Sequence, residues 1–165
     1  MNRSALIVGA GSGLSSSLAL QCANLGMDVA LAARNVEKLE DLSIQAKASL
    51  HKCDASKIDD VNRLFEDLDE KLGIPELVVY NPSARLRGAI ETLDPEKTKE
   101  ALHVTCFGAF LVAQQAAKRM LKRGSGSIFF TGASAGVKGF ANSSVFAMGK
   151  FGLRGLAQAL ARELH

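Results

Sequence analysis

A short apolar run near the N-terminus leads directly into a glycine-rich turn. Gly9, Gly11 and Gly13 stand at alternate positions, and a helical pattern begins directly after them. Glycines here let a phosphate group approach the backbone, and the start of a helix offers unpaired N–H groups and a positive dipole end. A second strand-like run follows about 20 residues further on, which is the context of a dinucleotide site. We expect this turn to bind a pyrophosphate through the residues Gly9, Gly11, Ser12, Gly13 and Leu14.

The end of the second strand-like run indicates which dinucleotide the turn favours. A site for NAD has a carboxylate here that bonds the ribose hydroxyls, whereas this chain has Ala33, Arg34 and Asn35. The planar guanidinium of Arg34 suits a 2′-phosphate, to which Ser12 could add a hydrogen bond. We therefore expect NADP(H) to be preferred, with NAD(H) as the alternative. The competing interpretation is that Arg34 merely ends a strand at the surface.

Apolar runs of strand length alternate with stretches of helical periodicity along the chain. The expected strands are Ser4–Val8, Met27–Ala33, Ser49–Cys53, Leu77–Tyr80 and Ser127–Thr131. The expected helices are Leu14–Leu25, Val36–Lys47, Lys57–Leu72, Pro95–Arg123 and a last one from Ser143 to the end. Nearly continuous apolar strands between helices indicate a parallel sheet covered on both faces. Right-handed crossovers then give a Rossmann-like, doubly wound α/β fold with strand order 3-2-1-4-5.

Length and composition are typical of one globular domain over residues 1–165. The net charge is only +3, with one tyrosine and no tryptophan, so we expect no nucleic-acid partner. Basic pairs such as Arg85 and Arg87 are interpreted as solvated faces. No run approaches the roughly 20 apolar residues that span a bilayer, and the first apolar run is too short for a signal peptide. These features predict a cytoplasmic protein without a membrane partner.

The cysteines and histidines carry no metal-ligand spacing, so we expect no metal site. Cys22, Cys53 and Cys106 are odd in number, far apart and set in apolar surroundings. This pattern favours buried, reduced thiols.

Further segments follow the glycine turn in a fixed order. Asp54 and Ala55 follow the third expected strand, and an Asn-Pro-Ser turn follows the fourth. Near the start of the last helix, Phe146 precedes Lys150 by four residues, and similar sequence continues to the end. Taken together, these segments resemble the short-chain dehydrogenase/reductase family over essentially the whole chain. Each motif is weak alone, and their common order carries the resemblance.

The resemblance implies the remaining cofactor-binding residues. In the family, an aspartate after the third strand lies against the adenine, and an Asn-Asn-Ala-Gly turn follows the fourth strand. The helix lysine holds the ribose hydroxyls. Carried onto this sequence, these roles fall on Asp54, Ala55, Asn81, Pro82, Ser83 and Lys150.

The resemblance also implies where family catalysis would take place. A tyrosine gives a proton to the carbonyl oxygen, and a lysine four residues on lowers its pKa. A serine and an asparagine complete the group. Here Phe146 stands at the tyrosine position, Ala133 at the serine position and Thr105 at the asparagine position. Only Lys150 is retained, and Ser134 is the candidate substitute donor.

Two classes of function therefore stay open. The first is an NAD(P)(H)-dependent oxidoreductase acting on an unknown carbonyl or alcohol, with a water, a serine or a substrate group in place of the tyrosine. The second is a nucleotide-binding or partner subunit without chemistry. The family favours the first, and Phe146 and Ala133 favour the second.

Family members continue past the helix that carries Lys150 into further strands and a substrate loop. Residues 1–165 contain no counterpart of these strands, so we expect the fifth strand to have an open edge and the last helix an uncovered apolar face.

The resemblance finally implies a homodimer or homotetramer formed through the fourth helix and the last helix. The fourth helix is rich in apolar residues: Ala109, Phe110, Val112, Ala113, Ala116, Ala117 and Met120. The last helix carries small residues that permit close contact: Ala147, Gly149, Gly152 and Gly155. The competing interpretation is that these faces only cover the sheet.

Overall fold

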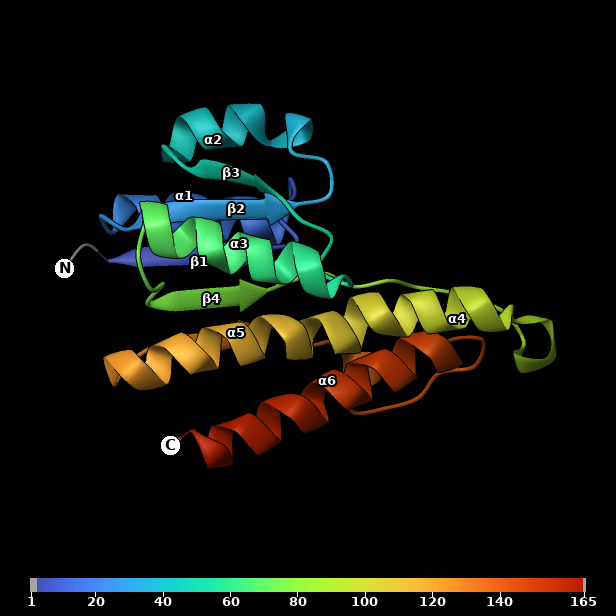
Figure 1. Cartoon of the computed structure of the whole chain (residues 1–165). Coiled ribbons are helices and arrows are strands. Elements are labelled where there is room, and N and C mark those ends of the chain that lie inside the picture. Colours follow the sequence, from blue (N-terminus) through green and yellow to red (C-terminus); the bar gives the residue numbers. More distant parts are fainter. Residues whose placement is uncertain (1–2, 165) are drawn as a thin grey trace.

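A computed structural model describes residues 3–164 as a three-layered α/β structure built on one parallel sheet (Figure 1). The strands are β1 (Ser4–Val8), β2 (Asp28–Ala33), β3 (Ser49–Lys52), β4 (Leu77–Tyr80) and β5 (Ser127–Phe130). Their order is β3-β2-β1-β4-β5, and each neighbouring pair is parallel. The predicted fold class and strand order are therefore confirmed.

The helices alternate with the strands as the sequence predicts, except that two helices separate β4 from β5. They are α1 (Leu14–Asn24), α2 (Glu40–Ala46), α3 (Ile58–Lys71), α4 (Pro95–Leu102), α5 (Gly108–Arg123) and α6 (Ser144–Glu163). The helix expected over residues 36–47 is shorter than predicted, because a 3₁₀ turn over Glu37–Leu39 precedes α2 and left-handed Lys47 ends it.

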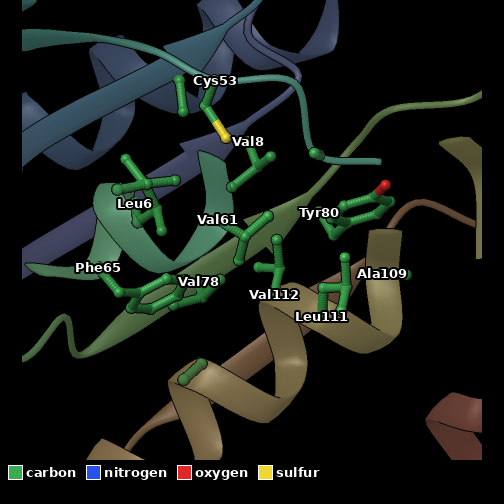
Figure 2. Packing of buried hydrophobic residues seen from close by; sticks show 14 of the residues in the cluster. Leu6, Val8, Cys53, Val61, Phe65, Val78, Tyr80, Ala109, Leu111 and Val112 are labelled. Carbon is green, nitrogen blue, oxygen red and sulfur yellow. The ribbon is translucent and has the colours of Figure 1, made fainter. Parts of the chain in front are cut away.

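Each strand sends alternate side chains to opposite faces of the sheet, so the sequence builds two cores. Leu6 and Val8 of β1 face α3 and α5, where they pack among side chains that include Val61 and Val112 (Figure 2). The alternate β1 residues Ala5 and Ile7 face α1 and α2. Both faces are therefore covered, which explains why β1 reads as a continuous apolar run.

The stretch expected as one helix over residues 95–123 is interrupted by a π-helical turn, His103–Phe107, between α4 and α5. The wider turn frees backbone groups from the regular helical ladder. The hydroxyl of buried Tyr80 donates a hydrogen bond to the Val104 carbonyl oxygen at 2.5 Å. Gly108 follows because a Cβ there would collide with that hydroxyl. The expectation of an uninterrupted helix was wrong at this point.

Strand β5 pairs only with β4 among the described residues. Ile128 and Phe130 point toward the α5 side, whereas Phe129 on the opposite face is 58% exposed. A cavity of about 610 Å³ lies between β5, α5 and α6, and Leu121 and Leu160 are among its walls. The open edge expected from the sequence is thus present. Within residues 3–164, no helix is long and apolar enough to cross a membrane.

Candidate active site

The glycine turn is held at the carboxyl end of the sheet by hydrogen bonds from two neighbouring segments. Gly9 has a left-handed backbone (φ 77°), and a Cβ there would lie 2.7 Å from Pro82. The Asn81 amide donates to the Ser15 hydroxyl at 2.8 Å, and that hydroxyl donates to the Gly9 carbonyl oxygen at 3.2 Å. Asn81 therefore fixes the shape of the turn, and glycine is required at position 9.

The rest of the turn is open to solvent. A Cβ at Gly11 or Gly13 would meet nothing within 4 Å, so space lies directly beside this backbone. Gly13 caps α1 without a side-chain hydrogen bond, and the first N–H groups of a helix have no partner within the helix. The turn thus presents unobstructed donors and a positive helix end, which suits a phosphate.

A cleft of about 430 Å³ runs along the carboxyl ends of β1, β2, β3 and β4. Its walls include these predicted residues: Gly9, Arg34, Asp54, Ala55, Asn81, Pro82 and Ser83. Sequence reasoning missed other wall residues: Ala10, Asn35, Ser56 and Val104. Most of these adjoin predicted positions, whereas Val104 comes from the π-helical turn and carried no signal. The predicted residues Gly11, Ser12, Gly13, Leu14 and Lys150 do not line this cleft.

Asp54 is held in a local hydrogen-bonded turn at the floor of the cleft. Its carboxylate accepts from the Ser56 hydroxyl at 2.7 Å and from the Ser56 N–H at 3.1 Å. Partial burial by itself raises the pKa of Asp54, but the hydrogen bonds from Ser56, with Lys57 and Arg34 nearby, lower that pKa below its ordinary value. Asp54 is therefore an ionised hydrogen-bond acceptor at neutral pH.

Arg34 stands on the cleft wall just after β2. It is exposed and forms no hydrogen bond or ion pair with any described residue. The neighbouring Asn35 uses its side-chain oxygen to accept from the Glu37 N–H at 3.1 Å. The guanidinium at this end of the cleft is thus free to bind an external anion.

Lys150 lies on α6 and is buried, with 4% of its surface exposed. Its Nζ donates to the Thr131 carbonyl oxygen at 2.6 Å, and its ammonium lies 5.9 Å from the centre of the Phe146 ring. Burial lowers the pKa of Lys150, and the positive charge of Arg85 lowers it further. The structure therefore brings together Lys150 and Phe146, beyond the end of β5.

Arg85 also lies against Phe146. Its guanidinium carbon lies 4.5 Å from the centre of that ring, which is a cation–π arrangement. Arg85 is exposed, as its interpretation as part of a solvated face predicts, and it also contacts the Phe146 ring. No sequence signal pointed to this contact, since Arg85 and Phe146 are far apart in the chain.

Thr105, at the family's asparagine position, and Ser134, the candidate substitute donor, have different surroundings. Thr105 is 1% exposed, and its hydroxyl accepts a hydrogen bond from the Ala84 N–H at 3.0 Å. Ser134 is exposed and opens the short turn Ser134–Gly136, which packs against α6 directly after Ala133. The Ser134 hydroxyl has no hydrogen-bond partner among the described residues. It is thus available to a ligand, whereas the Thr105 hydroxyl already has a structural partner.

Comparison with known proteins places this geometry in a family. The family model described as short chain dehydrogenase matches residues 3–165. The human 3-oxoacyl-[acyl-carrier-protein] reductase is 29% identical over 99% of this chain and 70% of its own length. A solved short-chain dehydrogenase from Rhodopseudomonas palustris is 30% identical with a TM-score of 0.93, covering 99% of this chain and 79% of that one. A metagenomic short-chain oxidoreductase solved in complex with NADP is 26% identical with a TM-score of 0.94, covering 98% and 76%.

The chain belongs to the short-chain dehydrogenase family, whose matched members are oxidoreductases. The cleft at the carboxyl end of the sheet and the group formed by Phe146, Lys150 and Arg85 are therefore the candidate sites for this chemistry.

Proposed function

We propose that this protein is an NADP(H)-dependent oxidoreductase that interconverts a carbonyl and an alcohol. The observation that carries the proposal is the unpaired guanidinium of Arg34 on the cleft wall, with no carboxylate at the end of β2. A carboxylate at this place would repel a 2′-phosphate, whereas a free guanidinium attracts one. The relative solved in complex with NADP, whose fold matches this chain, supports the proposal.

The residues present fit such a cofactor. The open backbone at Gly11 and Gly13 leaves room for a pyrophosphate beside the start of α1. Asp54 and the Asn81 turn line the adjoining cleft, where Asp54 offers an ionised acceptor for the adenine. Arg34 would hold the 2′-phosphate at the β2 end. Lys150, on α6, would hold the ribose hydroxyls.

The chemistry must proceed without a phenol. When bound, a nicotinamide cofactor supplies or accepts a hydride. Phe146 has no proton to give, and the Lys150 ammonium already donates to the Thr131 carbonyl oxygen. We assign the proton on the product oxygen to water or to the unpaired Ser134 hydroxyl. Lys150 stabilises negative charge that develops on that oxygen.

We also propose a homodimer or homotetramer. A groove of about 400 Å³ opens on the outer side of α5 and α6, and its walls include Phe107, Phe110 and Met148. Phe110 is 42% and Met148 54% exposed. Adjacent exposed apolar side chains of this size are typical of an interface.

Cofactor titration of an Arg34→Ala variant tests the proposal. We expect NADPH affinity to fall roughly ten- to a hundredfold, because a charge-assisted hydrogen bond is lost, while NADH affinity stays within twofold. Lys38→Ala is the matched control, since Lys38 is exposed nearby but does not line the cleft. Equal affinities for the two cofactors in the wild type, unchanged by Arg34→Ala, would contradict the cofactor assignment. Binding without turnover of any carbonyl would instead indicate a nucleotide-binding subunit.

A further inference from the structure

A second cationic site lies apart from the cofactor cleft, around Phe146. The Arg85 guanidinium covers the Phe146 ring at 4.5 Å, and the Lys150 ammonium lies 5.9 Å from the same ring centre. Neither cation forms an ion pair with any acidic residue within residues 3–164. Two cations sharing one ring without a carboxylate produce a local positive potential that an anion would neutralise.

The two cations differ in what they can still bind. The Lys150 ammonium is buried and donates to the Thr131 carbonyl oxygen. Arg85 is exposed and donates no hydrogen bond to any described residue. Its guanidinium lies over the Phe146 ring, and its N–H groups have no hydrogen-bond partner among the described residues. A carboxylate, a planar acceptor with two oxygens, matches the fork of a guanidinium.

The loop that carries Arg85 is anchored on both sides. The Ala84 N–H donates to the Thr105 hydroxyl at 3.0 Å, and the same hydroxyl lies 3.5 Å from the Ala84 carbonyl oxygen. Three residues after Arg85, the Gly88 N–H donates to the Asn142 carbonyl oxygen at 3.2 Å. The backbone on both sides of Arg85 is therefore anchored, and the cation–π contact places its guanidinium against Phe146. Thr105, at the family's asparagine position, acts here as a positioning residue for this loop.

We propose that Arg85 is a substrate-binding residue and that the substrates of this protein are carbonyl compounds that carry a carboxylate. The carboxylate accepts two hydrogen bonds from the Arg85 guanidinium, which directs the carbonyl group toward Lys150 and Ser134. This inference rests on the proposed function, because it assigns the substrate class of the same site.

The test uses a matched pair of probes, the keto acid levulinate and its uncharged methyl ester. Their dissociation constants are measured by ligand-observed NMR titration of the full chain, with and without NADP⁺. We expect levulinate to bind at least about tenfold more tightly than the ester, as a charge-assisted hydrogen bond to a carboxylate implies. Arg85→Gln should abolish this difference, and Arg85→Lys should retain only part of it, because the charge remains and the planar fork is lost.

Arg87→Gln is the control variant, because Arg87 is exposed on the same loop and forms no hydrogen bond, ion pair or ring contact with any described residue. It should leave the preference for the acid intact. Equal binding of acid and ester to the wild type would overturn the inference, as would a preference that survives Arg85→Gln or falls equally in Arg87→Gln.

A separate titration with NADPH distinguishes the two proposals. An Arg85-dependent preference for levulinate in a protein that binds no cofactor would leave the carboxylate site standing and refute the proposed oxidoreductase. Cofactor binding with reduction of neutral ketones and no preference for the acid would support the oxidoreductase and refute the carboxylate site.

Discussion

At the scale of single residues, the surroundings of Phe146 are those of a site for negative charge. A buried ammonium and an exposed guanidinium both lie close to this ring. A phenol at this position would therefore be easier to ionise, since two nearby cations stabilise a phenolate. The phenylalanine removes the proton donor but leaves its electrostatic environment in place.

Phe146→Tyr makes this environment measurable. We expect the pKa of the new phenol to lie below its ordinary value of about 10. The measurement is the near-ultraviolet absorbance of phenolate against pH. The absorbance change of the new phenol is separated from that of Tyr80, the single native tyrosine, because Tyr80 is buried and burial raises its pKa.

Adding Arg85→Gln to Phe146→Tyr is the control, and it should raise the pKa of the new phenol again. A new phenol that titrates at or above pH 10 would show that burial outweighs both cations.

At the scale of elements, the close packing of α6 against the π-helical turn positions the Lys150 helix. A Cβ at Gly149 would lie 2.9 Å from Thr105, and one at Gly152 would lie 2.8 Å from Cys106. From the sequence, these small residues were expected to form contacts between subunits. Both glycines instead serve contacts inside one chain, and a Cβ at Gly155 would meet nothing within 4 Å.

Gly149→Ala and Gly155→Ala should therefore shift stability in opposite directions. In an unobstructed helix, alanine is more stable than glycine by roughly 0.5–1 kcal/mol. At Gly155 this gain should appear in full. At Gly149 the overlap with buried Thr105 should outweigh it, giving a net loss on the order of 1–2 kcal/mol.

The measurement is the free energy of unfolding in urea for both variants and the wild type. Stabilisation by both substitutions would contradict the close approach of α6 to Thr105.

At the scale of the whole molecule, the two faces of α5 have separate roles. Most of the apolar residues that the sequence assigned to an interface instead cover the sheet, including Ala109, Val112 and Ala116, which are fully buried. Phe107 and Phe110 remain on the outside, with stacked rings 6.1 Å apart. The expected excess of apolar surface on this helix is therefore smaller than predicted, and it remains at the groove and at Leu121.

Phe110→Asp should convert the proposed oligomer to a monomer, because it introduces a charge into an apolar contact. The measurement is light scattering at micromolar concentration. Leu121→Asp is the control on the same helix, since Leu121 is exposed beside the other cavity, and it should leave the mass unchanged. A monomeric wild type would refute the proposed association.

The parts of the molecule that were predictable are those with a local signal. The strands and the glycine turn follow from apolar runs and from glycines within a few residues of one another. The π-helical turn carries no comparable pattern, because it depends on the Tyr80 hydroxyl reaching the Val104 carbonyl oxygen from another element. The contact between Arg85 and Phe146 was not predictable for the same reason, since Phe146 lies on α6.

The proposed function requires that this chain transfer hydride between NADP(H) and a carbonyl group without a tyrosine at position 146. The most direct measurement follows deuterium from NADPH labelled on its nicotinamide ring into an alcohol product, with a keto acid such as levulinate as the acceptor. We expect deuterium on the former carbonyl carbon, in a reaction slowed by Arg34→Ala and abolished by Lys150→Met. Tight NADPH binding with no transfer to any keto acid, ketone or aldehyde would contradict it.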